Sequence, residues 1–158
     1  GWGTGSGRGA SSARVKRHQR IPFEAIPPFP PSTVPGHEGA LILGALAGES
    51  VIVQSGRFHP YEGHSAERST LVVRTMAALD VDTLILTNAS GGIRFGWRPG
   101  TLMLVSDFLN LTWLPASRAP KAISNELWMA GGVALDPNLR ERARAVARDR
   151  GIGLEEGV

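Results

Sequence analysis

The sequence contains no cysteine, a single tyrosine and no apolar stretch long enough to cross a bilayer. The lack of cysteine excludes disulfide bonds and thiolate chemistry, and it fits a reducing cytoplasm. The chain does not open on a charged segment followed by an apolar core and a small-residue cleavage site, so nothing indicates secretion. No two histidines stand at the spacing of one helical turn. We therefore expect a cytoplasmic protein with no membrane partner and no metal site.

The net charge of the chain suggests a nucleic-acid partner, but the distribution of the charges argues against one. The net charge is +3 and the isoelectric point about 10.2, but seventeen basic residues are offset by fourteen acidic ones. The basic run over residues 14–20 contains no aromatic side chain that could stack on a base. The second basic cluster, residues 140–150, is interleaved with Glu141 and Asp149 at helical spacing, which is typical of a solvated helix face. We expect no nucleic-acid partner.

The first part of the chain is dominated by glycine, serine and proline. The 158 residues fit one domain, which we place over residues 1–158. Residues 1–12 are rich in glycine and serine and predict a loop. Six prolines in residues 22–35 exclude a helix and predict an extended surface segment. Two short apolar runs, residues 40–43 and 51–54, flank a turn signal and predict a hairpin.

The rest of the chain alternates helix and strand signals. A helix is expected behind Ser65, strands over residues 83–86 and 102–105, and a second helix that starts at the cap Asp136 and stops at Gly151. This order predicts an α/β fold. The apolar stripes expected to face inward are Leu71, Val72, Thr75, Met76 and Leu79 on the first helix, and Leu139, Ala143 and Val146 on the second.

A glycine-rich segment surrounds Ser6 near the start of the chain. Glycines alternate with other residues over positions 3–9, so the backbone can fold closely around an anion while the hydroxyl points at it. It is not a Walker loop, because no Lys-Ser or Lys-Thr follows. Taken alone, the segment favours a flexible tail over an anion-binding loop.

The stretch over residues 55–63 crowds chemically active side chains at the end of an apolar strand. Loops at strand ends commonly carry sites. Arg57 and His59 are two residues apart, so in an extended chain they share a face and can converge on a phosphate dianion. The alternative is a surface ion pair between Arg57 and Glu62. Tyr61 lies within the same stretch.

Small residues follow the predicted strand over residues 83–86. Asn88 and Ala89 precede two glycines, and their backbone N–H groups can approach a ligand closely; a tight turn is the alternative. His37, on a loop after a Pro-Gly pair, is a candidate ligand contact or a solvated histidine. His18 and His64 receive no role.

These motifs, taken in order, resemble the signature blocks of trimeric purine nucleoside phosphorylases. Three ordered blocks form a specific signal, and the resemblance extends over nearly the whole chain. The blocks are Ser32-Thr33-Val34-Pro35-Gly36-His37, Gly56-Arg57-Phe58-His59 with Tyr61-Glu62-Gly63, and Thr87-Asn88-Ala89 with Gly91-Gly92, and Gly5-Ser6-Gly7 resembles the family's first phosphate loop.

The resemblance implies an activity and a role for each matching residue. In this family phosphate attacks the anomeric carbon of a purine nucleoside, so inorganic phosphate is a co-substrate and no cofactor is needed. Developing charge would be stabilised by fixed contacts. The implied phosphate site is Ser6, Arg57, His59 and the backbone of Ala89, with Tyr61 at the ribose, His59 and Glu62 as catalytic residues, and His37 and Asn88 nearby.

The resemblance also implies a mixed twisted central sheet flanked by helices, a homotrimer, a role in purine salvage, and a single partial nucleoside phosphorylase domain that is truncated at both ends. The family's purine-reading residues belong to a second half that residues 1–158 do not match, so the purine-binding residues are unknown. Methylthioadenosine phosphorylase is a sister alternative, although Tyr61-Glu62-Gly63 favours the nucleoside enzyme. A phosphate-binding fragment without turnover is the non-enzyme alternative.

Overall fold

The computed structural model describes residues 14–31, 39–109 and 135–158. The chain divides into two compact units, one ending at Gly91 and one beginning at Gly92, and each is described by itself. The predicted loop over residues 1–12, with Ser6, and the predicted ligand contact His37 lie outside the described residues. Within the described ranges, no helix is both long and apolar enough to span a membrane.

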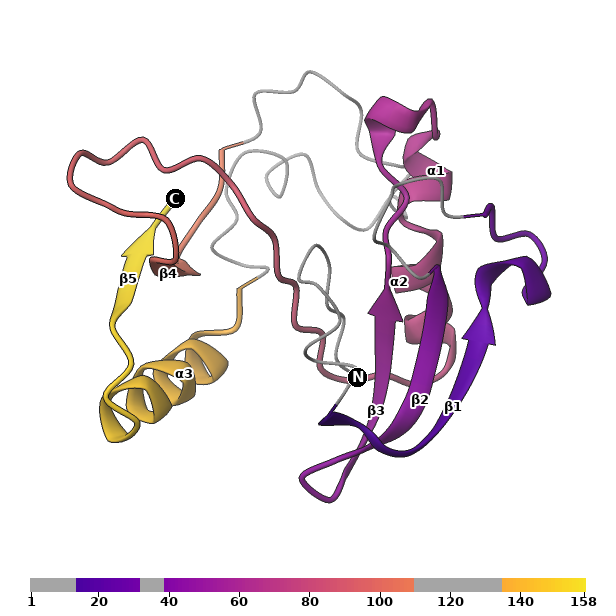
Figure 1. The fold of residues 1–158 in the computed structure, drawn as a ribbon, viewed down its shortest axis with the longest axis horizontal. Coiled ribbons are helices and arrows are strands. Elements are labelled where there is room, and N and C mark those ends of the chain that lie inside the picture. The colour runs from indigo at the N-terminus through magenta and orange to yellow at the C-terminus, as the bar shows by residue number, and fades with distance from the viewer. Residues whose placement is uncertain (1–13, 32–38, 110–134) are drawn as a thin grey trace. The chain divides into compact units, whose positions relative to one another are not determined.

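The first unit is built on an antiparallel sheet of three strands, in the order β1 (Lys16–Pro22), β2 (Ala40–Leu46) and β3 (Glu49–Ser55) (Figure 1). β2 and β3 pair over their whole length, from Ala40 opposite Ser55 to Leu46 opposite Glu49. Ala47 and Gly48 join them with positive φ angles of 53° and 92°, the backbone of a tight hairpin turn. The predicted hairpin is confirmed.

The edge strand β1 falls on the basic run and has no apolar alternation that would have predicted it. Its register with β2 shifts between Lys16 and Gln19, where the strand bulges. Gly44 of β2 lies under this bulge: a Cβ there would sit 2.5 Å from Cγ1 of Val15 and 2.9 Å from the carbonyl oxygen of Lys16. Only a residue without a side chain lets the two strands approach this closely.

An aromatic cluster forms the main core of the first unit. The ring centroids of Phe23 and Phe58 lie 5.0 Å apart, and Phe29 meets both rings edge to face. The prediction of an extended surface segment over residues 22–35 is therefore wrong for its described part, which forms a short 3-10 helix, η2 (Phe23–Ala25), and buries two aromatic rings. The prolines exclude an α-helix, but the burial of apolar rings determines where the segment lies.

The predicted helix behind Ser65 is present as two pieces, α1 (Ala66–Ser69) and α2 (Leu71–Ala78). The Ser65 hydroxyl accepts a hydrogen bond from the N–H of Arg68, as a serine cap should. Val72 and Met76 are buried as predicted. Leu79 is 55% exposed, contrary to the prediction, because α2 ends before it.

The predicted buried strand over residues 83–86 is wrong. This segment forms no strand, and Leu84 and Leu86 are exposed. A β-strand needs a neighbour to receive its backbone hydrogen bonds, and among the described residues no strand pairs with this one. Apolar composition alone therefore predicted a strand whose pairing partner is absent from the described part of the chain.

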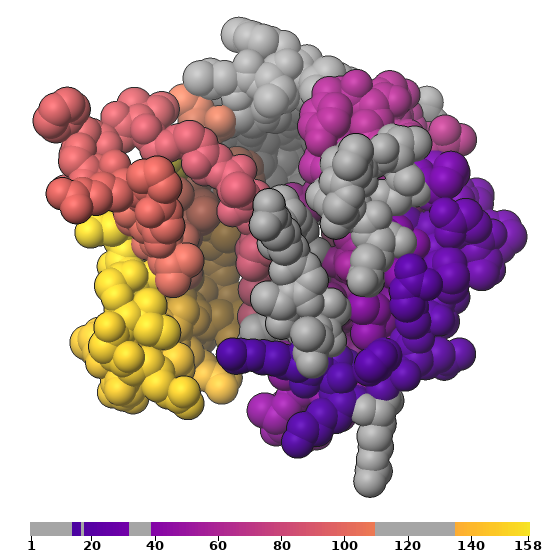
Figure 2. All heavy atoms as spheres, viewed as in Figure 1, coloured from indigo at the N-terminus to yellow at the C-terminus, as the bar shows by residue number. Residues whose placement is uncertain are grey.

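The second unit pairs β4 (Leu102–Val105) with β5 (Leu154–Gly157) in parallel and carries helix α3 (Pro137–Asp149) between them in sequence. The predicted β4 and the helix signals are confirmed: the Asp136 carboxylate accepts from the N–H groups of Asn138 and Leu139, and Pro137 occupies the first turn. Figure 2 shows the atoms of α3 and β5 as one yellow group.

The inward face of α3 differs from the prediction. Ala147 is buried, but Leu139 and Val146 are exposed. Arg140 and Arg144 instead direct their guanidinium groups to Glu156 on β5. The basic cluster is thus a solvated helix face only in part, since charge pairing turns two of its arginines toward the neighbouring strand. With parallel and antiparallel pairs and helices in the described residues, the α/β prediction is confirmed.

Candidate functional site

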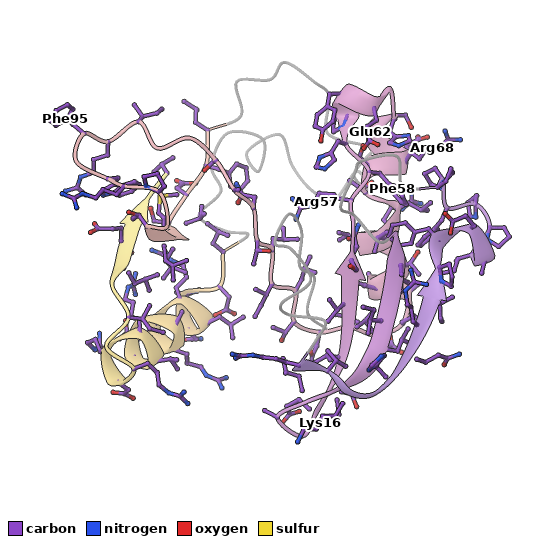
Figure 3. The ribbon with its side chains drawn as sticks, in the orientation of Figure 1. Lys16, Arg57, Phe58, Glu62, Arg68 and Phe95 are labelled. Carbon is purple, nitrogen blue, oxygen red and sulfur yellow. The ribbon has the colours of Figure 1, made fainter. Side chains whose placement is uncertain are left out.

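The candidate site begins where β3 ends and the chain turns. Gly56 has a φ of 109°, a conformation that favours glycine, and redirects the backbone away from the sheet. Phe58 follows and is almost completely buried in the aromatic core. Figure 3 shows Arg57, Phe58 and Glu62 coming from this end of the sheet. The buried Phe58 ring therefore anchors the loop between the two predicted phosphate ligands, Arg57 and His59.

A short 3-10 helix, η3 (Pro60–Glu62), holds the next three predicted site residues together. His59 is its N-cap: the backbone N–H of His59 donates to Oε2 of Glu62 at 2.8 Å, and the backbone N–H of Glu62 donates to the carbonyl oxygen of His59 at 3.0 Å. The rings of His59 and Tyr61 stack 4.6 Å apart at an interplanar angle of 13°. Tyr61 is otherwise exposed, so one face of its ring is covered by His59 while most of the side chain stays accessible.

Arg57 connects this loop to the second predicted ligand segment. Its Nη2 donates to the carbonyl oxygen of Thr87 at 2.7 Å, across thirty residues of sequence. The side chain is partly buried, and desolvation lowers the pKa of Arg57. Asn88 and Ala89, which follow Thr87 directly, are exposed. The structure therefore brings Arg57 beside the segment whose backbone the sequence predicted as a ligand contact.

The arrangement suits an anion. A guanidinium beside residues 87–89, with a histidine and a tyrosine on the adjoining turn, supplies hydrogen-bond donors and one positive charge. In the described ranges no three histidine, aspartate or glutamate side chains group as they would around a metal ion. The predicted residues are thus connected as two sets: His59, Tyr61 and Glu62 with one another, and Arg57 with the residue preceding Asn88.

Two features of the site were missed by sequence reasoning. The carbonyl of Thr87 as a partner of Arg57 left no signal, because the contact depends on how the intervening helices fold. The capping role of His59 did leave one: proline at the first helical position and glutamate at the third are typical of a helix start.

The fold and the site define an α/β chain with hydrogen-bond donors and an arginine gathered at the end of a strand. Comparison with known families makes this specific: the model of the phosphorylase superfamily matches residues 8–158. The chain belongs to the phosphorylase superfamily.

The most informative relatives are purine nucleoside phosphorylases, which confirms the resemblance that the motifs indicate. Purine nucleoside phosphorylase 1 of Geobacillus stearothermophilus is 41% identical over 98% of this chain and 57% of its own length. The Mus musculus enzyme is 44% identical over 98% of this chain and 55% of its own length. The crystal structure of the Schistosoma mansoni enzyme in complex with inosine has a TM-score of 0.78 at 33% identity, over 99% of this chain and 58% of that one. The chain thus spans a little over half the length of these relatives.

Proposed function

We propose that this chain binds inorganic phosphate and takes part in the phosphorolysis of purine ribonucleosides and deoxyribonucleosides to the free base and (deoxy)ribose 1-phosphate. The observation that carries the proposal is the hydrogen bond from Arg57 to Thr87, which places a cation beside the segment that contains Asn88 and Ala89. The solved relatives with inosine and with ribose 1-phosphate support this substrate class.

In the proposed reaction an oxygen of phosphate forms a bond to the anomeric carbon while the glycosidic bond breaks. The purine leaves with the electron pair, and the ribose passes through a cationic transition state. Arg57 balances the charge of the phosphate, while the Ala89 N–H and His59 donate hydrogen bonds to it.

Ser6 completes the proposed phosphate site and Tyr61 contacts the ribose. Glu62 positions His59, and His37 and Asn88 lie near the bound substrates.

Because phosphate is itself the nucleophile, the protein needs no nucleophilic side chain and no cofactor. The proposed site residues act mainly by positioning the reactants. Phosphate held next to the anomeric carbon reacts as in an intramolecular reaction and does not first have to collide with the nucleoside. A homotrimeric, cytoplasmic protein of purine salvage is part of the same proposal, supported by the cysteine-free sequence for the location. Sedimentation of the purified chain measures its oligomeric state.

Calorimetric titration with inorganic phosphate tests the site. Arg57→Ala should weaken phosphate binding at least tenfold, since losing a hydrogen bond to a charged group costs about 1.5–3 kcal/mol. Arg74→Ala, an exposed arginine on α2, is the control and should leave the affinity unchanged. Equal affinities in the two variants would remove Arg57 from the site.

Phosphate-dependent release of hypoxanthine from inosine tests the activity separately. Release that Arg57→Ala abolishes and Arg74→Ala preserves would support phosphorolysis at this site. Phosphate binding without any hypoxanthine release would instead favour the alternative of a phosphate-binding fragment.

A further inference from the structure

We propose that His64 is a positioning residue, whose ring packs on Phe58 and thereby holds in place the loop over residues 59–63. Three of the predicted site residues lie within this loop: His59, Tyr61 and Glu62. The consequence for phosphate binding rests on the function proposed above. The geometry of the loop is a property of the protein alone and can be measured without any ligand.

The contact between the two rings joins the two ends of the loop. The ring centroids of Phe58 and His64 lie 5.7 Å apart at an interplanar angle of 74°, an edge-to-face arrangement. Phe58 is almost completely buried and belongs to the aromatic core with Phe23 and Phe29. His64 therefore attaches the far end of the loop to the same buried ring that anchors its near end.

The backbone on both sides of His64 is held in a defined conformation. Gly63 ends η3 with a φ of 82°, which favours glycine, and its N–H donates to the carbonyl oxygen of Pro60 at 3.0 Å. Ser65 is the N-cap of α1 and accepts the N–H of Arg68. Because a closed turn precedes position 64 and a capped helix follows it, fixing the His64 ring also fixes the end of the loop.

The proposed role depends on the ring of His64 and not on its polar atoms. Nε2 of His64 is buried and has no hydrogen-bond partner among the described residues. A buried polar atom without a partner costs free energy, and an apolar group of similar shape in its place is nearly neutral or stabilising. We therefore expect a phenylalanine ring at position 64 to hold the loop as well as the imidazole does.

Holding the loop closed orders the residues that would meet the substrate. The rings of His59 and Tyr61 stack within it, and Glu62 accepts the backbone N–H of His59. A loop that is ordered before binding has less conformational entropy to lose when phosphate binds. His64 thus acts on the site through the loop and not through a contact with phosphate.

Proton NMR of the full chain tests the loop without a ligand, because Tyr61 is the only tyrosine in the sequence. In the wild type, the stacked imidazole of His59 should shift the ring signals of Tyr61 upfield. His64→Ala should move these signals toward the positions of a free tyrosine, whereas His64→Phe should preserve them. His18→Ala replaces an exposed histidine of β1 and, as the control, should leave them unchanged. Unchanged Tyr61 signals in His64→Ala, or equal changes in His64→Ala and His64→Phe, would overturn the proposal.

Circular dichroism during heating separates positioning from general stability. His64→Ala should melt at a lower temperature than the wild type, and His64→Phe at the same temperature or a higher one. The NMR spectra are recorded well below the melting temperature of each variant, where the chain is folded. If the Tyr61 signals of His64→Ala changed only as the chain unfolded, His64 would act on stability alone and the proposal would fail.

Calorimetric titration with inorganic phosphate completes the test. His64→Ala should weaken phosphate binding roughly three- to tenfold, the cost of ordering one more side chain on binding, and His64→Phe should restore the wild-type affinity. Equal phosphate affinities in the wild type and His64→Ala would refute the effect of His64 on binding. If the Tyr61 signals change as expected but the wild type binds no phosphate, the proposed function fails while the role of His64 in ordering the loop stands.

Discussion

The two units of the chain are stabilised by different interactions. The first unit buries two apolar clusters, one around Phe23, Phe58 and Met76 and one around Val53 of the sheet. In the described part of the second unit, Ala147 is the one buried hydrophobic residue. Its helix is joined to its strand by charged groups instead. The comparison shows that a regular helix or strand can form with or without a buried apolar cluster against it.

The energies of these interactions differ in size. Burying one large apolar side chain contributes about 1.5–3 kcal/mol, whereas an exposed ion pair contributes about 0–1 kcal/mol. Glu156 receives both Arg140 and Arg144, and Glu141 receives Arg144 and Arg148. Linked ion pairs hold one another's side chains in position, which strengthens each pair. These pairs are nevertheless exposed to water and screened by salt. We therefore expect the first unit to be the more resistant to unfolding.

Introducing a charge into the apolar core should have the largest effect. Met76→Asp places an unpaired carboxylate in the cluster with Phe23 and Phe58 and should unfold the first unit. Leu79→Asp, three residues further along and exposed, is the matched control. Circular dichroism during heating measures both variants. Unchanged melting of a soluble Met76→Asp protein would refute the placement of α2 in the core.

Removing an aromatic ring from each unit sharpens the comparison. Phe58→Ala should lower the free energy of unfolding by about 3–5 kcal/mol, because the ring is buried among Phe23, Phe29 and His64. Phe95→Ala removes a ring that is fully exposed in the second unit and extends away from the ribbon (Figure 3), so the change should stay within about 0.5 kcal/mol. Urea denaturation measures both. Similar losses in the two variants would mean that the units do not differ as described.

The smallest effect is expected at the charge network, and it should depend on pH. The hydrogen bond from Arg144 lowers the pKa of Glu156 to about 2. A lowered pKa in the folded state stabilises the fold above the ordinary glutamate pKa of about 4.3, and the contribution disappears as the pH falls toward 2. Glu156→Gln should therefore speed hydrogen exchange in α3 at neutral pH, with the difference from wild type closing below pH 4.

Glu155→Gln, on the same strand, is the control for this variant. Glu155 meets only Arg94 among the described ion pairs, at 3.7 Å, so its loss should change exchange in α3 less than the loss of Glu156. Equal effects of the two substitutions at neutral pH would argue against a specific contribution from the Arg144 contact.

Local signals in the sequence predicted the elements whose cause is itself local. Asp136 and Pro137 predicted the start of α3, because a helix cap depends only on the residues of the first turn. Two short apolar runs on either side of Gly48 predicted the hairpin. The inward faces of Leu139 and Val146 and the strand over residues 83–86 were wrong, because both depend on what lies opposite them. Periodicity identifies an apolar face but not the partner that covers it.

The candidate site also has one part that local sequence predicted and one part that it did not. Arg57, His59, Tyr61 and Glu62 were identified by their chemistry at the end of one strand, and the structure joins the last three through one turn. The contact of Arg57 with Thr87 spans thirty residues, and nothing in either motif predicts it. A local motif predicts which side chains lie together in a site. A long-range contact such as this one depends on how the chain between the two motifs folds.

The bond between Arg57 and Thr87 also has a consequence for the order of folding. It closes a loop that contains both α1 and α2, so we expect it to form later than the hairpin of β2 and β3, which needs only neighbouring residues. We therefore expect the candidate site to be among the last parts of the first unit to assemble. A ligand that binds Arg57 beside residues 87–89 would bind only the closed loop, and phosphate would slow the reopening of this segment before it affected the hairpin.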